Sequence, residues 1–88
     1  MFKIYKYAIP IEDNFDLELP VGSKILHIAS QRDEGFLWAL VDPNVHSVKR
    51  HFRLVGTGHS IEKHLYINYI GTFQMMGGNL IWHLFELV

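Results

Sequence analysis

The sequence predicts an all-β domain of about seven short, mostly antiparallel strands in a small barrel or sandwich, with at most one short helical turn. β-branched and aromatic residues occur in short runs, and Gly, Pro, Asn and Asp interrupt these runs about every ten residues. Helical periodicity is almost absent. Short strands with short connections favour a barrel or a sandwich, because both architectures protect sheet edges that would otherwise aggregate.

The first three expected strands end at turn residues, and the second of them alternates polar and apolar residues. In the segment from Phe15 to Leu19, Asp16 and Glu18 fall on one face. A short link through Pro10 separates this segment from the preceding run, so we expect these two strands to pair antiparallel. The three strands are Phe2 to Ile9, Phe15 to Leu19 and Lys24 to Ser30.

The rest of the chain predicts four more strands. The segment from Phe36 to Val41 is apolar on both faces, which favours a central position in a sheet. Met76-Gly77-Gly78-Asn79 is a strong hairpin signal between the last two strands. Ser60 to His64 is the expected site of the one helical turn. The four strands are Phe36 to Val41, Ser47 to Val55, Leu65 to Met75 and Leu80 to Leu87.

Length and composition exclude several classes of protein. With 88 residues the chain forms a single domain, residues 1–88. A net charge of −1 argues against non-specific nucleic-acid binding. The chain has no cysteine, which is typical of a reducing compartment, and it has neither a signal-like apolar run nor a membrane-length one. We therefore expect a cytoplasmic location without membrane association.

The glycine-rich segment Gly56-Thr57-Gly58-His59 is the candidate site with the clearest chemistry. Glycines allow successive backbone N–H groups to converge on an anion. The segment lacks the lysine of a P-loop and the third glycine of a dinucleotide fingerprint. Two interpretations remain: an anion cradle assisted by Lys49 and Arg53, or a tight structural turn.

Alternation in the preceding strand places Lys49, His51 and Arg53 on one face. That face is either an ordinary solvated surface or a basic strip that receives phosphates or carboxylates. The opposite face includes the core side, and Arg50 is its one charged member. We expect Arg50 at the rim, with its stem packed and its guanidinium in water.

Aromatic residues supply a second group of candidates, because aromatics make up 14% of this small chain. Trp38 and Phe73 are expected in the core. Trp82, Tyr69 and Tyr5 are expected either in the core or at a pocket or subunit seam, where a ring can stack on a nucleobase or anchor a partner.

Metal and catalytic chemistry lack support in the sequence. His46, His51, His59 and His64 do not follow a common zinc spacing. Serines adjacent to histidines do not supply the facing side chains that a nucleophile and its base need. His27 and His83 lie inside apolar strands, where core or interface roles are more typical. We expect no catalytic residue, no metal and no cofactor.

Six segments spread over nearly the whole chain form a distinctive set: Leu19 to Leu26, Leu37 to Pro43 (LWALVDP), Phe52-Arg53, Gly56 to Ile61 (GTGHSI), Tyr69 to Thr72 (YIGT) and Gly78 to Glu86 (GNLIWHLFE). Together they resemble a family of small uncharacterised proteins encoded by bacteriophages and prophages. The resemblance implies no catalytic role. It implies a setting, the cytoplasm of an infected bacterium, where small phage proteins commonly act against host defence.

Two functions from different classes fit this setting, and the glycine-rich segment beside basic residues favours the first of them. In the first, the protein sequesters a nucleotide-type immune signal, such as a cyclic oligonucleotide or an ADP-ribose-like molecule, without turnover. A homodimer would enlarge the pocket for such a ligand. The second function is inhibition of a host defence enzyme, or an accessory role in the virion, through a protein interface with no small-molecule site. The expected ligand-binding residues are Lys49, Arg53, Gly56, Thr57, Gly58, His59, Tyr69 and Trp82.

Overall fold

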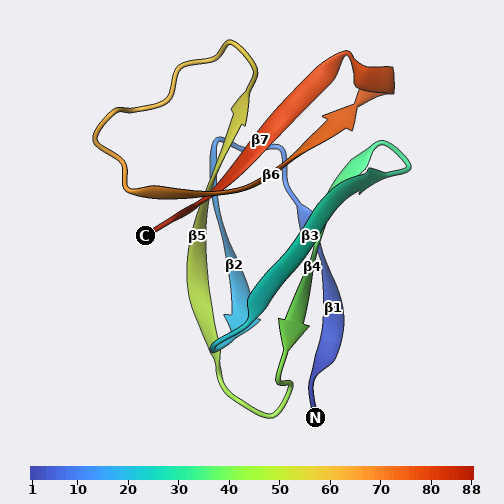
Figure 1. The fold of residues 1–88 in the computed structure, drawn as a ribbon, viewed down its shortest axis with the longest axis vertical. Helices are drawn as coiled ribbons and strands as arrows, with labels where there is room; N and C mark the ends of the chain where they lie inside the picture. Colours follow the sequence, from blue (N-terminus) through green and yellow to red (C-terminus); the bar gives the residue numbers. More distant parts are fainter.

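A computed structural model describes all residues 1–88 and confirms the all-β prediction (Figure 1). Seven strands and one 3-10 turn make up the regular structure, and no helix is long and apolar enough to cross a membrane. The elements are β1 (Lys3–Ile9), β2 (Asn14–Pro20), β3 (Lys24–Gln31), β4 (Glu34–Val41), β5 (Ser47–Gly56), β6 (Ile67–Met75), η1 (Met76–Gly78) and β7 (Leu80–Leu87).

The strands form two antiparallel sheets, one in the order β1-β4-β3 and the other in the order β2-β5-β7-β6. The sheets meet where β3 packs along β6. At this junction Gly71 has no room for a side chain, because a Cβ there would lie 2.8 Å from Cγ1 of Ile28. β1 and β2 are the outermost strands on the opposite side. The fold is therefore a sandwich that is closed along β3 and β6 and open along β1 and β2.

The expected pairing of the first two strands is wrong. β1 pairs with β4, and β2 pairs with β5 in the other sheet. The link between β1 and β2 crosses from one sheet to the other, because Ile9 before it and Phe15 after it both bury their side chains between the sheets. The central position expected for the segment from Phe36 is confirmed, since β4 lies between β1 and β3.

The hairpin between β6 and β7 is confirmed, but the helical turn lies within it and not at Ser60 to His64. Met76 and Gly77 both have positive φ, 52° and 62°, and the Met76 N–H donates to Oδ1 of Asp33 at 2.5 Å. Residues 57–66 instead form an irregular segment without helix or strand, which is the long loop on the left of Figure 1.

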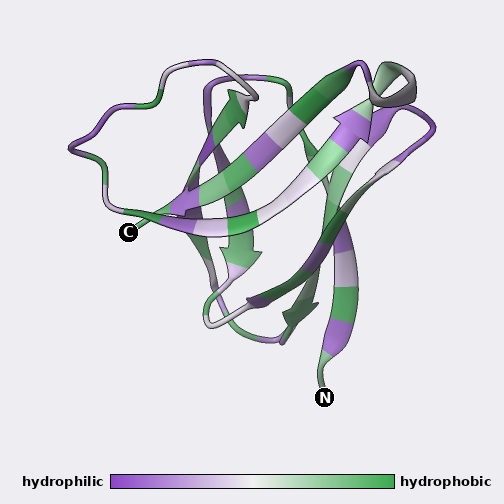
Figure 2. Ribbon diagram, turned by 45° about the horizontal axis from the view of Figure 1, so that its top comes forward, coloured by the Kyte–Doolittle hydropathy of each residue, from purple (hydrophilic) through white to green (hydrophobic).

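The core fills the space between the two sheets. Hydrophobic and hydrophilic residues alternate along the strands (Figure 2), as expected for strands with one face on this core. Phe73 is buried as expected, and its ring lies over Gly35 of the opposite sheet. Trp38 is not in the core. Its neighbours Leu37 and Ala39 take inward positions on β4, so Trp38 faces outward and stays partly exposed. The largest fully buried side chains are Leu19, Leu37, Val41, Phe52, Leu54 and Leu84.

Candidate functional site

The glycine-rich segment at the end of β5 is a tight turn. The His59 N–H donates to the carbonyl of Gly56 at 3.0 Å, and Gly58 has φ +87°. Positive φ at the third residue is the requirement of a type II turn, which glycine meets without strain. The Thr57 N–H donates to the Ile81 carbonyl at 3.1 Å. Two amides of the segment thus have acceptors within the protein and do not point at a shared anion.

Lys49 and Arg53 do not lie beside this turn as a basic strip. Lys49 is exposed near the other end of β5, opposite Glu18 on β2. Arg53 is only 6% exposed, although it lies on the outward face of its sheet. The irregular segment 57–66 covers Arg53 there, because Glu62 within it bonds to the guanidinium. Neither residue therefore adds positive charge to the Gly56–His59 turn.

The donors of the Arg53 guanidinium are used within the protein. Nη1 donates to the carbonyls of Asp13 and Leu54 at 3.1 and 3.0 Å, and Nε and Nη2 donate to the Glu62 carboxylate, each at 3.3 Å. A backbone hydrogen bond and then the bond from Arg53 lower the pKa of Glu62. Arg53 thus anchors the 57–66 segment, and an anionic ligand would have to displace Glu62 to reach it.

Arg50 also differs from the sequence expectation of a guanidinium in water. It points toward the inside of the sandwich, where Nε and Nη2 donate to the two carboxylate oxygens of Glu86, both at 2.6 Å. Nη1 donates to the Ser23 carbonyl at 2.5 Å. The inward position of Arg50 follows from strand alternation, and the acceptors that satisfy it come from segments far away in the sequence.

A small hollow lies beside the Gly56–His59 turn. Its volume is about 170 Å³, and Gly56, Thr57, His59 and Trp82 contribute to its wall. Both rings approach Gly56, since a Cβ there would lie 3.1 Å from His59 Nδ1 and 3.4 Å from Trp82 Cζ3. The structure therefore brings together Gly56, Thr57, His59 and Trp82 from two strands and a turn, as a ligand site would require.

Trp82 carries the one buried side-chain polar atom that lacks a hydrogen-bond partner, its Nε1. The ring packs against the core from β7. A buried donor without an acceptor costs free energy, and such groups are uncommon in folded proteins. The indole N–H is thus a group that a bound acceptor would satisfy.

Tyr69 lies apart from the hollow, on the outward face of the four-stranded sheet, where it is 61% exposed. Its hydroxyl is hydrogen-bonded with the Thr72 hydroxyl at 2.6 Å. His83 continues the chain, with Nδ1 3.0 Å from the Thr72 hydroxyl and Nε2 2.6 Å from the Thr57 hydroxyl. The chain links Tyr69 to the Gly56–His59 turn. The sequence predicts a core or interface role for His83 because its neighbours on β7 are apolar, but His83 faces outward and is partly exposed, with both ring nitrogens in this chain.

The outward face of the three-stranded sheet is a second candidate surface. Six of its outward positions hold apolar side chains, polar and charged residues lie among them, and no other strand packs against this face. Lys6 lies across this face, with Nζ 4.0 Å from the centre of the Phe36 ring and 2.7 Å from Oε1 of Gln31. A hollow of about 490 Å³ lies beside these residues. The apolar positions are Ile4, Ala8, Ala29, Phe36, Trp38 and Leu40.

The sequence model of one family, described as a domain of unknown function (DUF7352), matches residues 1–88. The chain belongs to this family. Comparisons with curated proteins and with solved structures found no match. The DUF7352 match extends over all seven strands, so both candidate surfaces lie within the family's domain. No three His, Asp or Glu side chains of this DUF7352 domain gather closely enough to hold a metal ion.

Proposed function

We propose that this DUF7352 domain is a non-catalytic binding protein that docks on another protein through the outward face of its three-stranded sheet. The observation that carries the proposal is the row of apolar side chains on that face, which no element of the fold covers. Ile4 is 60% exposed there, and Trp38 and Leu40 lie beside it on β4. Large uncovered apolar surfaces and surface aromatics are typical of protein interfaces.

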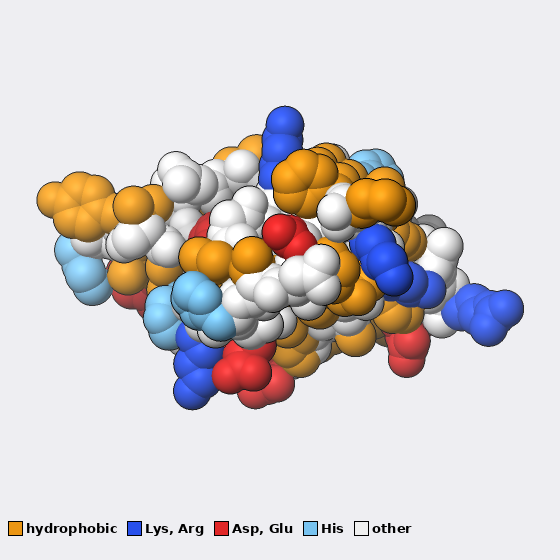
Figure 3. Space-filling model, turned by 90° about the horizontal axis from the view of Figure 1, so that it is seen from below, with side chains coloured by type: hydrophobic (Ala, Val, Ile, Leu, Met, Phe, Trp, Pro, Cys, Tyr) orange, Lys and Arg blue, Asp and Glu red, His pale blue; other side chains and the backbone are white.

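The charges around this face favour a partner whose contact surface is rimmed by carboxylates. Lys6 and Lys24 lie on the face, against the single carboxylate of Glu34. The hollow beside Phe36 gives a partner side chain a place to insert. Seen from the end of the molecule that carries the N-terminus, hydrophobic side chains reach the surface between charged ones (Figure 3). On the outward face itself, Lys6, Lys24 and Glu34 lie beside apolar side chains, and such a mixture is typical of non-obligate interfaces.

The resemblance to phage-encoded proteins supplies a setting for the proposal. In that setting the domain acts in the host cytoplasm, and its partner is a host defence enzyme or a protein of the virion. Inhibition by occlusion needs no chemistry from the domain, which fits an interface built from apolar side chains.

A pull-down from infected cells with a matched pair of variants tests the proposal. Ile4 and Leu40 face each other across β1 and β4, and threonine at both positions removes apolar surface while keeping residues that favour strands. We expect wild-type protein to retain one partner in stoichiometric amount and the Ile4→Thr/Leu40→Thr variant to lose it. Val21→Thr, in the exposed turn after β2, is the control and should retain the partner.

The wild type and both variants should give the same far-ultraviolet circular dichroism, which shows that the outward changes leave the fold intact. Retention of the partner by the Ile4→Thr/Leu40→Thr variant would exclude this face as the docking surface. Recovery of no stoichiometric partner by the wild type would contradict the protein-binding proposal itself.

A second candidate function is binding of a nucleotide-type ligand at the hollow beside His59. The convergence of Thr57, His59 and the Trp82 ring at this hollow favours it. At about 170 Å³ the hollow is smaller than the roughly 300–1,000 Å³ of typical ligand pockets, so it fits one end of a nucleotide. The amides of Thr57 and His59 donate to carbonyls of the protein, and Arg53 is bonded to Glu62. Lys49 lies near the other end of β5. This function therefore ranks second.

A thermal-shift panel of cyclic di- and trinucleotides and ADP-ribose derivatives tests the second candidate. A bound ligand should raise the melting temperature, and denaturation should release it intact. His59→Ala should abolish the shift, whereas Lys49→Ala should leave it unchanged, because Lys49 lies at the far end of β5. Absence of a shift across the panel would rule this function out, and conversion of a ligand to product would show an enzyme.

A further inference from the structure

The open side of the sandwich presents two strand edges together. β1 ends one sheet and β2 ends the other, and both lie on the side away from the contact of β3 with β6. The two strands run in opposite directions (Figure 1). Along each edge, backbone N–H and C=O groups have no neighbouring strand. Unpaired edges of this kind are templates for another strand.

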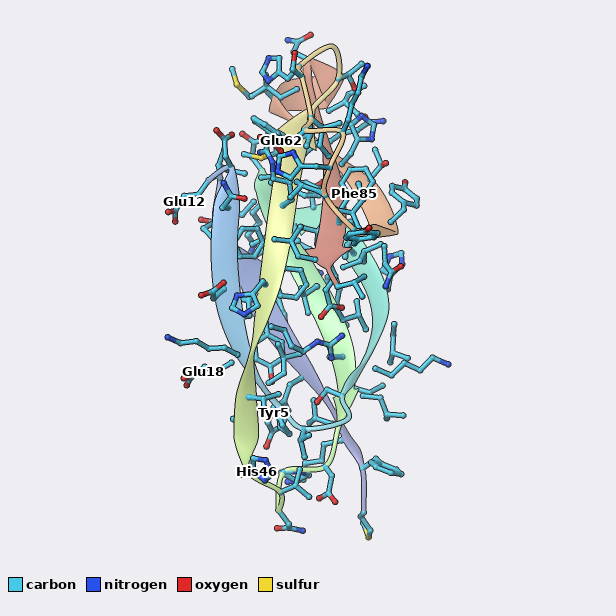
Figure 4. The ribbon with its side chains drawn as sticks, turned by 90° about the vertical axis from the view of Figure 1, so that its left-hand side faces the viewer. Tyr5, Glu12, Glu18, His46, Glu62 and Phe85 are labelled. Carbon is cyan, nitrogen blue, oxygen red and sulfur yellow. The ribbon has the colours of Figure 1, made fainter.

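The two edges carry opposite charge. β1 contains Lys3 and Lys6 and no acidic residue, whereas β2 contains Asp16 and Glu18 and no basic residue. Lys6 faces outward from its sheet, because it pairs with Trp38. Asp16 and Glu18 also face outward, and Glu18 points away from the ribbon in Figure 4. The charged side chains of both edges therefore lie on the outside of the sandwich.

We propose that two copies of this chain associate through their open sides, with β1 of each copy pairing antiparallel with β2 of the other. The two-fold axis runs along the strands. Each three-stranded sheet then continues into the four-stranded sheet of the other copy, and the inward faces of both point to one shared interior. Tyr5, which is 39% exposed and lies between the ribbons of β1 and β5 in Figure 4, becomes covered.

Charge selects this arrangement over the other two-fold arrangement of the same edges. If each strand paired with its own copy, Asp16 and Glu18 would face a second Asp16 and Glu18, and Lys6 would face Lys6. Like charges directly opposite each other on neighbouring strands are destabilising. Pairing of β1 with β2 instead places Lys6 of each copy beside Asp16 and Glu18 of the other copy, at each of the two seams where β1 meets β2. The interface is self-complementary and closes at two copies.

Light scattering after size-exclusion chromatography tests the arrangement on the full chain. We expect a particle of twice the 10.3 kDa chain mass at high protein concentration. Its dissociation should increase between about 50 mM and about 500 mM salt, because exposed charges at the seams are screened. Lys6→Glu should weaken the dimer about tenfold or more, since it replaces attraction with repulsion at both seams. Lys24→Glu on β3, at the closed side, should leave the dimer unchanged.

Mixing two variants provides a second readout that misfolding does not imitate. The Lys6→Glu protein and an Asp16→Lys/Glu18→Lys protein should each be monomeric alone. Together they should form a heterodimer, which an affinity tag on one of them captures, because both seams then join opposite charges. A wild-type chain that stays monomeric at all concentrations, or a dimer that Lys6→Glu leaves intact, would overturn the proposal. Neither outcome tests the separate proposal that another protein docks on the outward face of the three-stranded sheet.

Discussion

Arg50 and Glu86 form a bidentate ion pair on the inward side of the sandwich, with both N–O distances at 2.6 Å. The two side chains are 22% and 20% exposed. The side-chain hydrogen bond to Glu86 raises the pKa of Arg50, which keeps the guanidinium protonated. Because Arg50 also donates to the Ser23 carbonyl, it ties β5 and β7 to the turn before β3.

Glu86→Gln should lower the free energy of unfolding by about 1.5–3 kcal/mol, the range for a lost charge-assisted hydrogen bond. Partial exposure places the expected value toward the lower end of that range. Urea unfolding of the variant and of Glu34→Gln, an exposed change of the same kind, measures the difference. Equal stability of the two variants would show that the ion pair contributes nothing.

Gly35→Ala tests the packing that closes the two sheets on each other. A Cβ at position 35 would lie 2.5 Å from Cε2 of Phe73, a buried ring on the opposite sheet. We expect a loss of about 1–3 kcal/mol, the usual cost of overpacking a core. The change should cost less in a Phe73→Leu background, because the smaller side chain leaves room. Additive effects of the two changes in urea unfolding would refute direct contact between these positions.

The positions of the strands follow from the sequence, because strand ends depend on local turn residues and alternation. All seven strands begin and end within two residues of the predicted bounds, and the largest differences are the starts of β4 at Glu34 and of β6 at Ile67. Which strands pair with one another does not follow from the sequence in this way. Alternation in β2 specifies which side chains share a face, but it does not specify that β5 will be the neighbour.

The candidate site was predictable only in part, for the same reason. Gly56 to His59 form one turn because they are adjacent in the chain, and Trp82 joins them only through the pairing of β5 with β7. Arg53 was expected to face solvent, and strand alternation does place it outward. Glu62, nine residues later in an irregular segment, covers it by a contact that no periodicity encodes.

The stability of the protein should fall at alkaline pH because of Tyr7. Burial, and then the neighbouring Tyr5, raise the pKa of Tyr7 above its ordinary value of 10.0. Between the unfolded and folded pKa values the folded state holds the phenol proton more tightly than the unfolded chain does. The contribution is therefore fully present below pH 10.0 and is lost as the pH rises through the higher folded value.

Melting temperatures at about pH 8 and about pH 11 measure this loss. Tyr7→Phe has no phenol to ionise, so its melting temperature should fall less than that of the wild type between the two pH values. Tyr66→Phe, at an exposed ring in the 57–66 segment, should behave as the wild type does. An equal fall in all three proteins would remove Tyr7 as the cause.

The anchor between Glu62 and Arg53 should lose its effect in acid. A hydrogen bond from the Glu62 backbone and then the Arg53 guanidinium lower the pKa of Glu62 below its ordinary 4.5. The contribution to stability is present above pH 4.5 and disappears as the pH falls through the lower folded value.

Glu62→Gln should therefore lower the melting temperature at neutral pH, and the difference from the wild type should shrink below pH 4.5. Glu12→Gln, an exposed change near β2, should show no such convergence. Faster hydrogen exchange in residues 57–66 of the Glu62→Gln protein would accompany the loss, because Arg53 holds that segment against the sheet. A pH-independent difference would mean that the carboxylate charge plays no part in the anchor.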